Sequence, residues 1–197
     1  MWRKCCGSAR TKGGRALRVI AGDSRGKRLF SPDDHSIRPT SDKVKGAVFN
    51  MIGARVRDAV VVDFFSGSGG LGVEALSRGA RRCYFCDNAA KARALIVKNL
   101  AHCGMTDRAE VLLCDFRAAI ALIRDRADIV FLDPPYALDC YEDCLAAMAS
   151  AARLAEGCLA VLEHGAAARF PDTVSGFTKI KEKKYGSTGV TVFSYES

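Results

Sequence analysis

From residue 59 onward, short apolar runs alternate with longer segments in which apolar and polar residues are mixed. The apolar runs are 59–65, 83–87, 109–115, 128–135 and 157–164, and the mixed segments 70–80, 88–104, 116–126 and 140–154 separate them. The runs lack the polar alternation of half-exposed strands, so they are typical of parallel strands buried on both faces. The pattern therefore predicts an α/β fold, a mostly parallel sheet with helices on both faces.

The two ends of the chain have different patterns. Residues 177–197 hold two alternating runs around a Gly-rich turn, which predicts a hairpin whose second strand is antiparallel to the rest. Residues 17–32 predict a basic hairpin with its turn near Gly22 to Gly26. Residues 41–52 predict a helix that Ser41 or Thr40 caps. Its expected apolar face consists of Val44, Val48 and Met51 or Ile52.

Positive charge is concentrated in the first third of the chain. The 197 residues carry a net charge of +8, whereas residues 1–58 alone hold 14 Lys/Arg against 5 Asp/Glu. Such an excess indicates a partner with a phosphate backbone. We therefore expect a basic, flexible tail over 1–17, a nucleic-acid-binding hairpin and helix over 18–58, and a catalytic domain over 59–197. The candidate cations for binding that phosphate backbone are Arg25, Lys27, Arg28, Arg38, Lys43 and Lys45.

A glycine pattern follows the first apolar run of the expected catalytic domain. Gly67, Gly69 and Gly72 match G-x-G-x-x-G between a predicted strand and a predicted helix, where a nucleotide-like ligand approaches the backbone closely. Asp87 ends the next predicted strand, at the place where a carboxylate accepts hydrogen bonds from ribose hydroxyls. Together these features favour a ribose-bearing cofactor over a structural turn.

Asp63 decides between cofactors, because it lies four residues before the first glycine. A carboxylate there repels a pyrophosphate, but it accepts hydrogen bonds from an amino group or holds the glycine loop. S-adenosylmethionine has no phosphate and carries an ammonium group, so it suits the site better than a nicotinamide cofactor. Asp115 is either a partner for the adenine amino group or a helix N-cap, and Phe116 offers an apolar wall.

The fourth predicted strand ends in Asp133, Pro134, Pro135 and Tyr136. The prolines fix φ and have no N–H, so this stretch presents carbonyl acceptors and no backbone donors. Such acceptors suit an exocyclic amino group, and the Tyr136 ring offers a face on which a base stacks. We therefore interpret the stretch as the binding site of a planar, amine-bearing base rather than as a simple strand terminator.

Taken together, these motifs resemble a known family. The stretches LRVIAGDSRGKRL, RPTSDKVKGAVFNMI, DFFSGSGGLGVEALSRGA, FLDPPY and KKYGSTGVTVFSY are similar to the RsmD-type small-subunit (16S) ribosomal RNA guanine-N2 methyltransferases, within the class I S-adenosylmethionine-dependent superfamily. The chain departs from the family pattern at Gly46, where an acidic residue is usual, and at Asp87, where Glu is usual.

The resemblance implies a Rossmann-like class I fold: a seven-stranded, mostly parallel sheet with an antiparallel strand from the C-terminal hairpin and a small N-terminal hairpin and helix extension. It implies that Asp133, Pro134, Pro135 and Tyr136 form the catalytic site. By position, it assigns cofactor binding to Asp63, Phe65, Ser66, Gly67, Gly69, Asp87, Asn88, Asp115 and Phe116.

The expected reaction is methyl transfer from S-adenosylmethionine to a guanine N2 amine in ribosomal RNA, within a small-subunit particle and by a cytoplasmic monomer. A DNA adenine-N6 methyltransferase, a protein-glutamine methyltransferase and a non-catalytic RNA-binding protein of this fold are the alternatives. Methyl transfer to DNA, ribosomal RNA and protein substrates separates the first two from the expected reaction, and S-adenosylmethionine binding tests the third.

The cysteines and the apolar runs argue against a disulfide-stabilised protein, a cysteine metal site and a membrane protein. The cysteine count of nine is odd, and several cysteines lie in predicted elements, which favours a reducing cytoplasm over a disulfide framework. Cys83 and Cys86 have C-x-x-C spacing, but residues three apart on a strand point to opposite faces, so we expect no metal there. The sequence contains no run of 18 apolar residues, so it predicts no membrane span. The basic N-terminus lacks an apolar stretch of signal-peptide length, so we expect an unexported protein.

Overall fold

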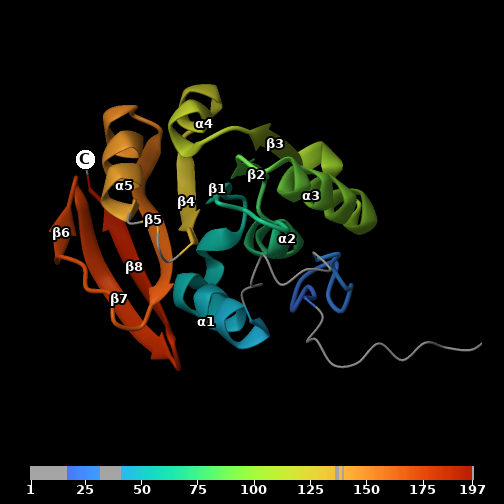
Figure 1. The fold of residues 1–197 in the computed structure, drawn as a ribbon, viewed down its shortest axis with the longest axis horizontal. Helices are drawn as coiled ribbons and strands as arrows, with labels where there is room; N and C mark the ends of the chain where they lie inside the picture. Colours follow the sequence, from blue (N-terminus) through green and yellow to red (C-terminus); the bar gives the residue numbers. More distant parts are fainter. Residues whose placement is uncertain (1–16, 32–40, 136–137, 139, 197) are drawn as a thin grey trace, which may run out of the picture.

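The computed structural model describes residues 17–31, 41–135, 138 and 140–196. One sheet of eight strands runs through the molecule in the order β3-β2-β1-β4-β5-β8-β7-β6 (Figure 1). The parallel strands are β1 (Val60–Phe64), β2 (Arg82–Asp87), β3 (Ala109–Leu113), β4 (Ala127–Leu132) and β5 (Leu154–Gly165). The antiparallel strands are β6 (Thr173–Val174), β7 (Phe177–Tyr185) and β8 (Thr188–Tyr195).

This arrangement confirms the class I methyltransferase fold and the C-terminal hairpin. Two details of the prediction were wrong. The sheet has an eighth strand, because the two-residue β6 pairs with the start of β7. The helix expected over 140–154 ends at Ser150, and Leu154 already belongs to β5. Leu154 pairs with Ala127 of β4, so tertiary pairing overrides the helical pattern at this boundary.

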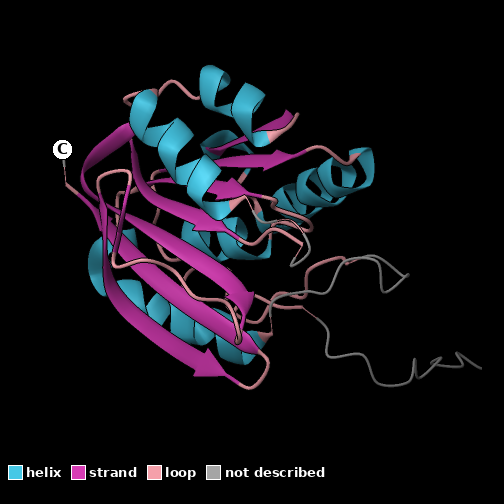
Figure 2. Cartoon of the chain, turned by 60° about the vertical axis from the view of Figure 1, so that its left-hand side comes forward, coloured by secondary structure: helices cyan, strands magenta, loops and turns pink. Residues whose placement is uncertain are grey.

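Helices cover both faces of the sheet (Figure 2). One face carries α1 (Asp42–Ile52), α2 (Gly70–Ser77) and α3 (Ala90–Cys103), whose apolar residues share a single buried cluster. The other face carries α4 (Phe116–Leu122) and α5 (Tyr141–Ser150), which share the second cluster. Two short 3₁₀ helices, η1 (Gly53–Val56) and η2 (Thr106–Arg108), precede β1 and β3. The central strands β1 and β4 are therefore buried from both sides.

The helix predicted over 41–52 is present as α1. The Ser41 hydroxyl accepts a hydrogen bond from the Val44 N–H, which confirms Ser41 as the N-cap. Val44, Val48, Met51 and Ile52 are buried, so the predicted apolar face is the face that packs on the sheet. The opposite side of α1 includes the exposed Lys43.

Cys83 and Cys86 diverge as their strand position predicts, because Cys83 joins the cluster under α1 to α3 and Cys86 joins the cluster under α4 and α5. Burial raises the pKa of both thiols above the ordinary range. Within residues 17–31, 41–135, 138 and 140–196, no group of three or more His, Cys, Asp or Glu side chains is arranged to hold a metal ion. No helix among the same residues is long and apolar enough to cross a bilayer.

The basic segment before α1 forms the predicted hairpin over residues 17–31. This hairpin is packed against the layer of α1, α2 and α3. Arg18 and Arg28 form an antiparallel bridge, and the Gly26 N–H donates to the Val19 carbonyl at 2.9 Å. Leu17, Val19 and Leu29 are buried in the same cluster as α1, α2 and α3. The hairpin and the sheet therefore share one core.

A buried carboxylate on α2 ties this hairpin to the rest of the fold. Glu74 accepts hydrogen bonds from the backbone N–H groups of Ile20 (2.7 Å) and Ala21 (3.0 Å). It also pairs with the ammonium of Lys45 at 3.2 Å and with the guanidinium of Arg78 at 2.8 Å. The Glu74 side chain is fully buried, so these partners replace the water that it loses.

Lys45 therefore corrects one expectation from the sequence, because it is not available to RNA. Its side chain is fully buried between α1 and α2, and its ammonium also donates to the Arg18 carbonyl. Burial lowers the pKa of Lys45, while the carboxylate of Glu74 opposes that shift. The charge count of the first third of the chain could not separate this buried cation from the exposed ones.

We predict that Lys45→Ala lowers the free energy of unfolding by about 3 kcal/mol, because it leaves Glu74 buried with one cation instead of two. Urea denaturation measures the loss. Lys43→Ala is the matched control, since Lys43 is exposed on the same helix and its removal should cost less than about 0.5 kcal/mol. Equal stability of the two variants would contradict the structural role of Lys45.

Candidate active site

The predicted site residues meet at the carboxyl edge of the parallel strands. The strand register places the end of β1 between the ends of β2 and β4, because Phe64 pairs with Cys86 on one side and Leu132 on the other. Asp87 pairs with Leu113, which brings the end of β3 to the same edge. The ends of the four strands and the segments that follow them contain the candidate residues Asp63, Phe65, Ser66, Gly67, Gly69, Asp87, Asn88, Asp115, Phe116, Asp133, Pro134 and Pro135.

The turn between β1 and α2 adopts backbone conformations that favour glycine. Gly67 and Gly69 have φ angles of 55° and 80°. Phe65 also has a positive φ, 59°, which is uncommon for an aromatic residue and marks the start of the turn. The Ser66 hydroxyl, which donates to the Asp63 carbonyl, accepts from the Cys86 N–H at 2.9 Å and ties the turn to β2.

Gly72, the third glycine of the pattern, has a different role from the first two. A Cβ atom at this position would lie 2.3 Å from the ring of Phe85. The missing side chain therefore lets α2 pack closely on β2, and it makes no room for a ligand. The backbone N–H of Gly72 donates to Asp63 Oδ2 at 2.9 Å, so the helix and the end of β1 are also joined directly.

Asp63 holds the glycine loop, which is one of the two roles that the sequence left open. The residue is only 2% exposed, and burial raises the pKa of its carboxyl to about 8. The hydrogen bond from Gly72 opposes the shift, whereas the negative charges of Asp133 and Asp87 add to it. The charges of Asp87 and Asp133 therefore concentrate negative potential at this edge, which suits a cationic ligand and disfavours a pyrophosphate.

Asp87 organises the loop from the neighbouring strand. Its Oδ2 accepts a hydrogen bond from the Gly67 N–H and its Oδ1 one from the Ala89 N–H, both at 2.9 Å. Each carboxylate oxygen has two lone pairs, so both oxygens retain capacity for ribose hydroxyls. Asp87 is half-buried, and the adjacent Asn88 is exposed.

Asp115 and the aromatic residues complete the edge beyond β3. Asp115 is the N-cap of α4, and its Oδ1 accepts from the Ala118 N–H at 2.9 Å, which confirms the capping alternative. The residue is exposed, so its other oxygen faces solvent beside the aromatic pair. Phe65 and Phe116 lie with ring centroids 6.2 Å apart, and Phe116 is buried against the second cluster. The pair provides an apolar wall next to a carboxylate.

Asp133 directly follows Leu132, the last residue of β4, which pairs with Phe64. The carboxyl groups of Asp133 and Asp63 interact electrostatically. Pro134 is buried and Pro135 is exposed. The Pro135 carbonyl accepts from the Leu138 N–H at 2.7 Å and closes a turn, so this carbonyl is already engaged. Tyr136 lies outside the described residues.

The candidate RNA-binding cations divide into separate groups. Arg25, Lys27 and Arg28 are exposed on the hairpin, where Lys27 also reaches the carbonyls of His102 and Cys103 at 3.4 Å. Lys43 is exposed on α1. Lys45 is buried, as described above, and Arg38 lies outside the described residues. The structure therefore brings the cofactor and catalytic candidates together, and it removes Lys45 from the exposed cations.

Sequence reasoning missed the polar residues that support the loop from behind. Asn99 on α3 is fully buried and donates to the Ser68 carbonyl at 2.8 Å and the Phe30 carbonyl at 3.0 Å. Its Oδ1 accepts from the Phe30 N–H at 2.7 Å, so one amide joins the hairpin to the glycine loop. One signal in the sequence could have indicated these buried polar contacts. Glu74 is a lone acidic residue in a helix of mostly apolar and small residues, and such a charge is rarely buried without partners.

The donor set at this edge fits the cofactor that the sequence suggested. The fit rests on a negative potential for an ammonium and sulfonium, a carboxylate at the end of β2 for ribose, and an aromatic wall beside an exposed carboxylate for adenine. The hydrogen bonds of Asp63 and Asp87 hold these groups in place before any ligand binds. The arrangement suits positioning and charge stabilisation.

The chain matches known proteins over most of its length. The profile of the family described as Conserved hypothetical protein 95 matches residues 17–194. "Putative rRNA methyltransferase YlbH" of Bacillus subtilis (strain 168) is 37% identical over 180 residues, which cover 90% of this chain and 98% of that protein. "Ribosomal RNA small subunit methyltransferase D" of Escherichia coli (strain K12) is 29% identical over 181 residues, 92% of this chain and 91% of that protein. The solved structure described as "Putative methyltransferase yhhF from Escherichia coli" superposes with a TM-score of 0.81 at 29% identity and covers 92% of this chain and 98% of that one.

We predict that Asp63 makes the protein less stable as the pH rises. Its folded pKa of about 8 exceeds the ordinary value of 3.8, so the folded state keeps a proton that the unfolded state releases. Between pH 4 and 8, this proton should lower the free energy of unfolding by at most about 1.4 kcal/mol per pH unit.

Asp63→Asn should remove this slope, because an amide does not titrate but still accepts from Gly72. Urea denaturation at pH 5, 6, 7 and 8 measures it. Asp107→Asn, at an exposed carboxylate, should keep the wild-type slope. If wild type and Asp63→Asn lose stability in parallel, the buried carboxyl is not the group that titrates.

Proposed function

This chain belongs to the family described as Conserved hypothetical protein 95, the RsmD family of methyltransferases, and on that premise we propose that it methylates the N2 amine of a guanine in small-subunit ribosomal RNA. The methyl donor in this proposal is S-adenosylmethionine. The relatives named as rRNA methyltransferases support the class of reaction. The observation that carries the proposal is the meeting of Asp63, Asp87 and Asp133 at one sheet edge.

The chain's own residues account for cofactor binding in this proposal. Asp87 accepts hydrogen bonds from the ribose hydroxyls while it keeps the Gly67 N–H. Asp115 and Phe116 hold the adenine, with its amino group toward the free carboxylate oxygen. A cation beside Asp63 offsets the charges of Asp133 and Asp87, which favours the ionised form of that carboxyl. Phe65, Ser66, Gly67, Gly69 and Asn88 shape the loop around the methionine and ribose.

Bound S-adenosylmethionine would supply an activated methyl group on a sulfonium. The work of the protein is then to place the guanine N2 nitrogen in line with that methyl carbon. Asp133 and the Pro134 carbonyl accept the two amine hydrogens, which draws the nitrogen lone pair out of conjugation with the ring. Asp133 is also placed to accept the proton that the nitrogen loses as its bond to carbon forms. A stacked, unpaired guanine meets these needs, so the target base is flipped or single-stranded.

The proposal further places the reaction in the cytoplasm, on RNA within a small-subunit particle, with a monomeric enzyme. Labelled methyl transfer to small subunits that lack the modification tests it directly. Nucleoside analysis should recover N2-methylguanosine. Recovery of label in DNA adenine or protein glutamine would select an alternative methyltransferase, and the absence of S-adenosylmethionine binding would point to a non-catalytic RNA-binding protein.

We predict that Asp87→Ala weakens S-adenosylmethionine binding by about 10- to 100-fold, because a charge-assisted hydrogen bond to ribose is worth about 1.5–3 kcal/mol. Titration calorimetry measures the affinity. Asp107→Ala is the control, since it removes the same charge from an exposed site away from the loop. Unchanged affinity in Asp87→Ala would remove the ribose assignment.

We predict that Asp133→Ala binds S-adenosylmethionine nearly as well as wild type but transfers methyl groups about 100-fold more slowly, because the base amine loses an acceptor that acts in the transition state. Single-turnover kinetics on the unmodified subunit separate the two steps. Tyr136→Ala should behave in the same way through lost stacking. Full single-turnover rates in either variant would leave that residue without a catalytic role.

A further inference from the structure

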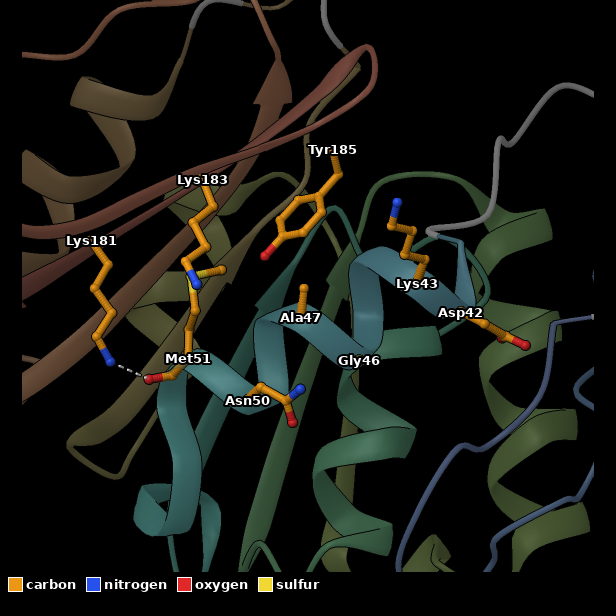
Figure 3. Close-up of a pocket in the computed structure, with 9 residues that line it drawn as sticks. All are labelled: Asp42, Lys43, Gly46, Ala47, Asn50, Met51, Lys181, Lys183 and Tyr185. Carbon is orange, nitrogen blue, oxygen red and sulfur yellow. Dashed lines mark hydrogen bonds between the residues drawn. The ribbon is translucent and has the colours of Figure 1, made fainter.

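A second candidate binding surface lies between α1 and β7, apart from the cofactor edge. It is an open groove of about 590 Å³ (Figure 3). From α1, Asp42, Lys43, Gly46, Ala47, Asn50 and Met51 line it, and from β7, Lys181, Lys183 and Tyr185. The two elements are far apart in the sequence, so the groove exists only in the folded chain. We name it the α1–β7 groove.

The floor of the α1–β7 groove is open because small residues lie at its centre. A Cβ atom added at Gly46 would meet nothing within 4 Å. Ala47 follows it and presents a single methyl group toward β7 (Figure 3). Glycine in a helix interior costs about 0.5–1 kcal/mol relative to alanine. The space above Gly46 is therefore maintained at some cost to the helix.

Cations from both walls are directed at this space. Lys43 and Lys183 are exposed, and neither forms an ion pair with a carboxylate in the part of the chain that the structure describes. The carboxylate that lines the groove, Asp42, is already paired with Arg18 at 2.8 Å. Lys181 donates to the Met51 carbonyl at 2.9 Å, which fixes β7 against the end of α1. The groove thus offers two uncommitted positive charges.

Tyr185 adds an aromatic face beside these cations. It is half-buried, packs against the cluster under α1 to α3, and extends over Ala47 (Figure 3). Glu182 and Lys184 alternate with the groove residues along β7 and point to the opposite face, toward His164. An aromatic ring between two lysines is the combination that binds a base and its phosphate in single-stranded nucleic acid.

The strand register relates the groove to the candidate catalytic residue. Lys183 pairs with Val190 of β8, and Val190 pairs with Glu163 of β5. Leu162, which precedes Glu163, pairs with Leu132, which precedes Asp133. Lys183 and Asp133 therefore lie on one transverse row of the sheet, three strands apart, or about 14 Å at the usual strand spacing. A strand of RNA whose target base lies at Asp133 reaches the groove within a few nucleotides.

We propose that the α1–β7 groove binds a nucleotide that flanks the target guanine in single-stranded ribosomal RNA. The base stacks on Tyr185, and the backbone phosphate lies between Lys43 and Lys183. Asn50, exposed on the same wall, is available to hydrogen-bond the base edge. This inference rests on the proposed function for the identity of the RNA, and it adds a contact that positions the substrate without touching the cofactor.

Lys183→Glu tests the groove, with Lys183→Arg as its matched control. Lys183 is exposed, so neither variant should lose stability. Glutamate reverses the charge on the β7 wall of the groove, whereas arginine keeps it. We expect Lys183→Glu to raise the Kd for the RNA and the KM for the subunit at least tenfold and to flatten the salt dependence of binding, whereas Lys183→Arg matches wild type.

A second pair of variants tests the stacking contact. Tyr185→Leu should weaken RNA binding about tenfold, because it keeps apolar packing but loses the ring, and Tyr185→Phe should bind like wild type. S-adenosylmethionine affinity should be unchanged in all four variants. If Lys183→Glu and Lys183→Arg bind RNA equally, or if Tyr185→Phe is as weak as Tyr185→Leu, the groove is not a nucleotide site.

The two proposals fail in different ways. Absence of methyl transfer by the wild-type enzyme would overturn the proposed function, and direct RNA titration would still report on the groove. Methyl transfer by wild type with equal KM and Kd in Lys183→Glu and Lys183→Arg would overturn the groove alone. Loss of S-adenosylmethionine binding in Lys183→Glu would also overturn it, because the groove would then act through the cofactor edge.

Discussion

The parallel pairing of β1 with β2 and β4 is the constraint on which the rest of this structure depends. All five residues of β1 are buried, so its backbone groups find partners only in the neighbouring strands. Parallel strands place their carboxyl ends at one edge, and the polar residues that end them must meet there. The positions of Asp63, Asp87 and Asp133 follow from this pairing. Their mutual repulsion makes the edge receptive to a cation.

Buried polar groups then connect the N-terminal hairpin to this sheet. Glu74 accepts hydrogen bonds from two backbone N–H groups of the hairpin, and Asn99 joins Phe30 to the glycine loop. Leaving such groups without partners is costly, so the hairpin, α1, α2 and the loop are held as one unit. A change in the hairpin therefore has a short route, through Asn99 and Ser68, to the glycine loop.

The cofactor edge and the α1–β7 groove divide the work of recognition in our proposals. The edge combines carboxylates and carbonyl acceptors, which suit a cation and an amine. The groove combines lysines with an aromatic ring, which suit a phosphate and a base. The sheet holds the two surfaces at a constant separation, because β4, β5, β8 and β7 are hydrogen-bonded neighbours. Rigid spacing of this kind positions a substrate without large motions of the enzyme.

The sequence by itself determined the fold class, the capped α1 helix, the C-terminal hairpin and the shared edge of the acidic strand ends. These follow from local periodicity, capping and the rule that parallel strands end together. It did not determine which cations face solvent, since Lys43 and Lys45 look alike in a charge count while one is exposed and the other is buried against Glu74. Nor did it reveal the α1–β7 groove or the role of Gly72 against Phe85. Those depend on contacts between residues far apart in the chain, and only the tertiary packing decides which side chains such contacts bury and which they leave open.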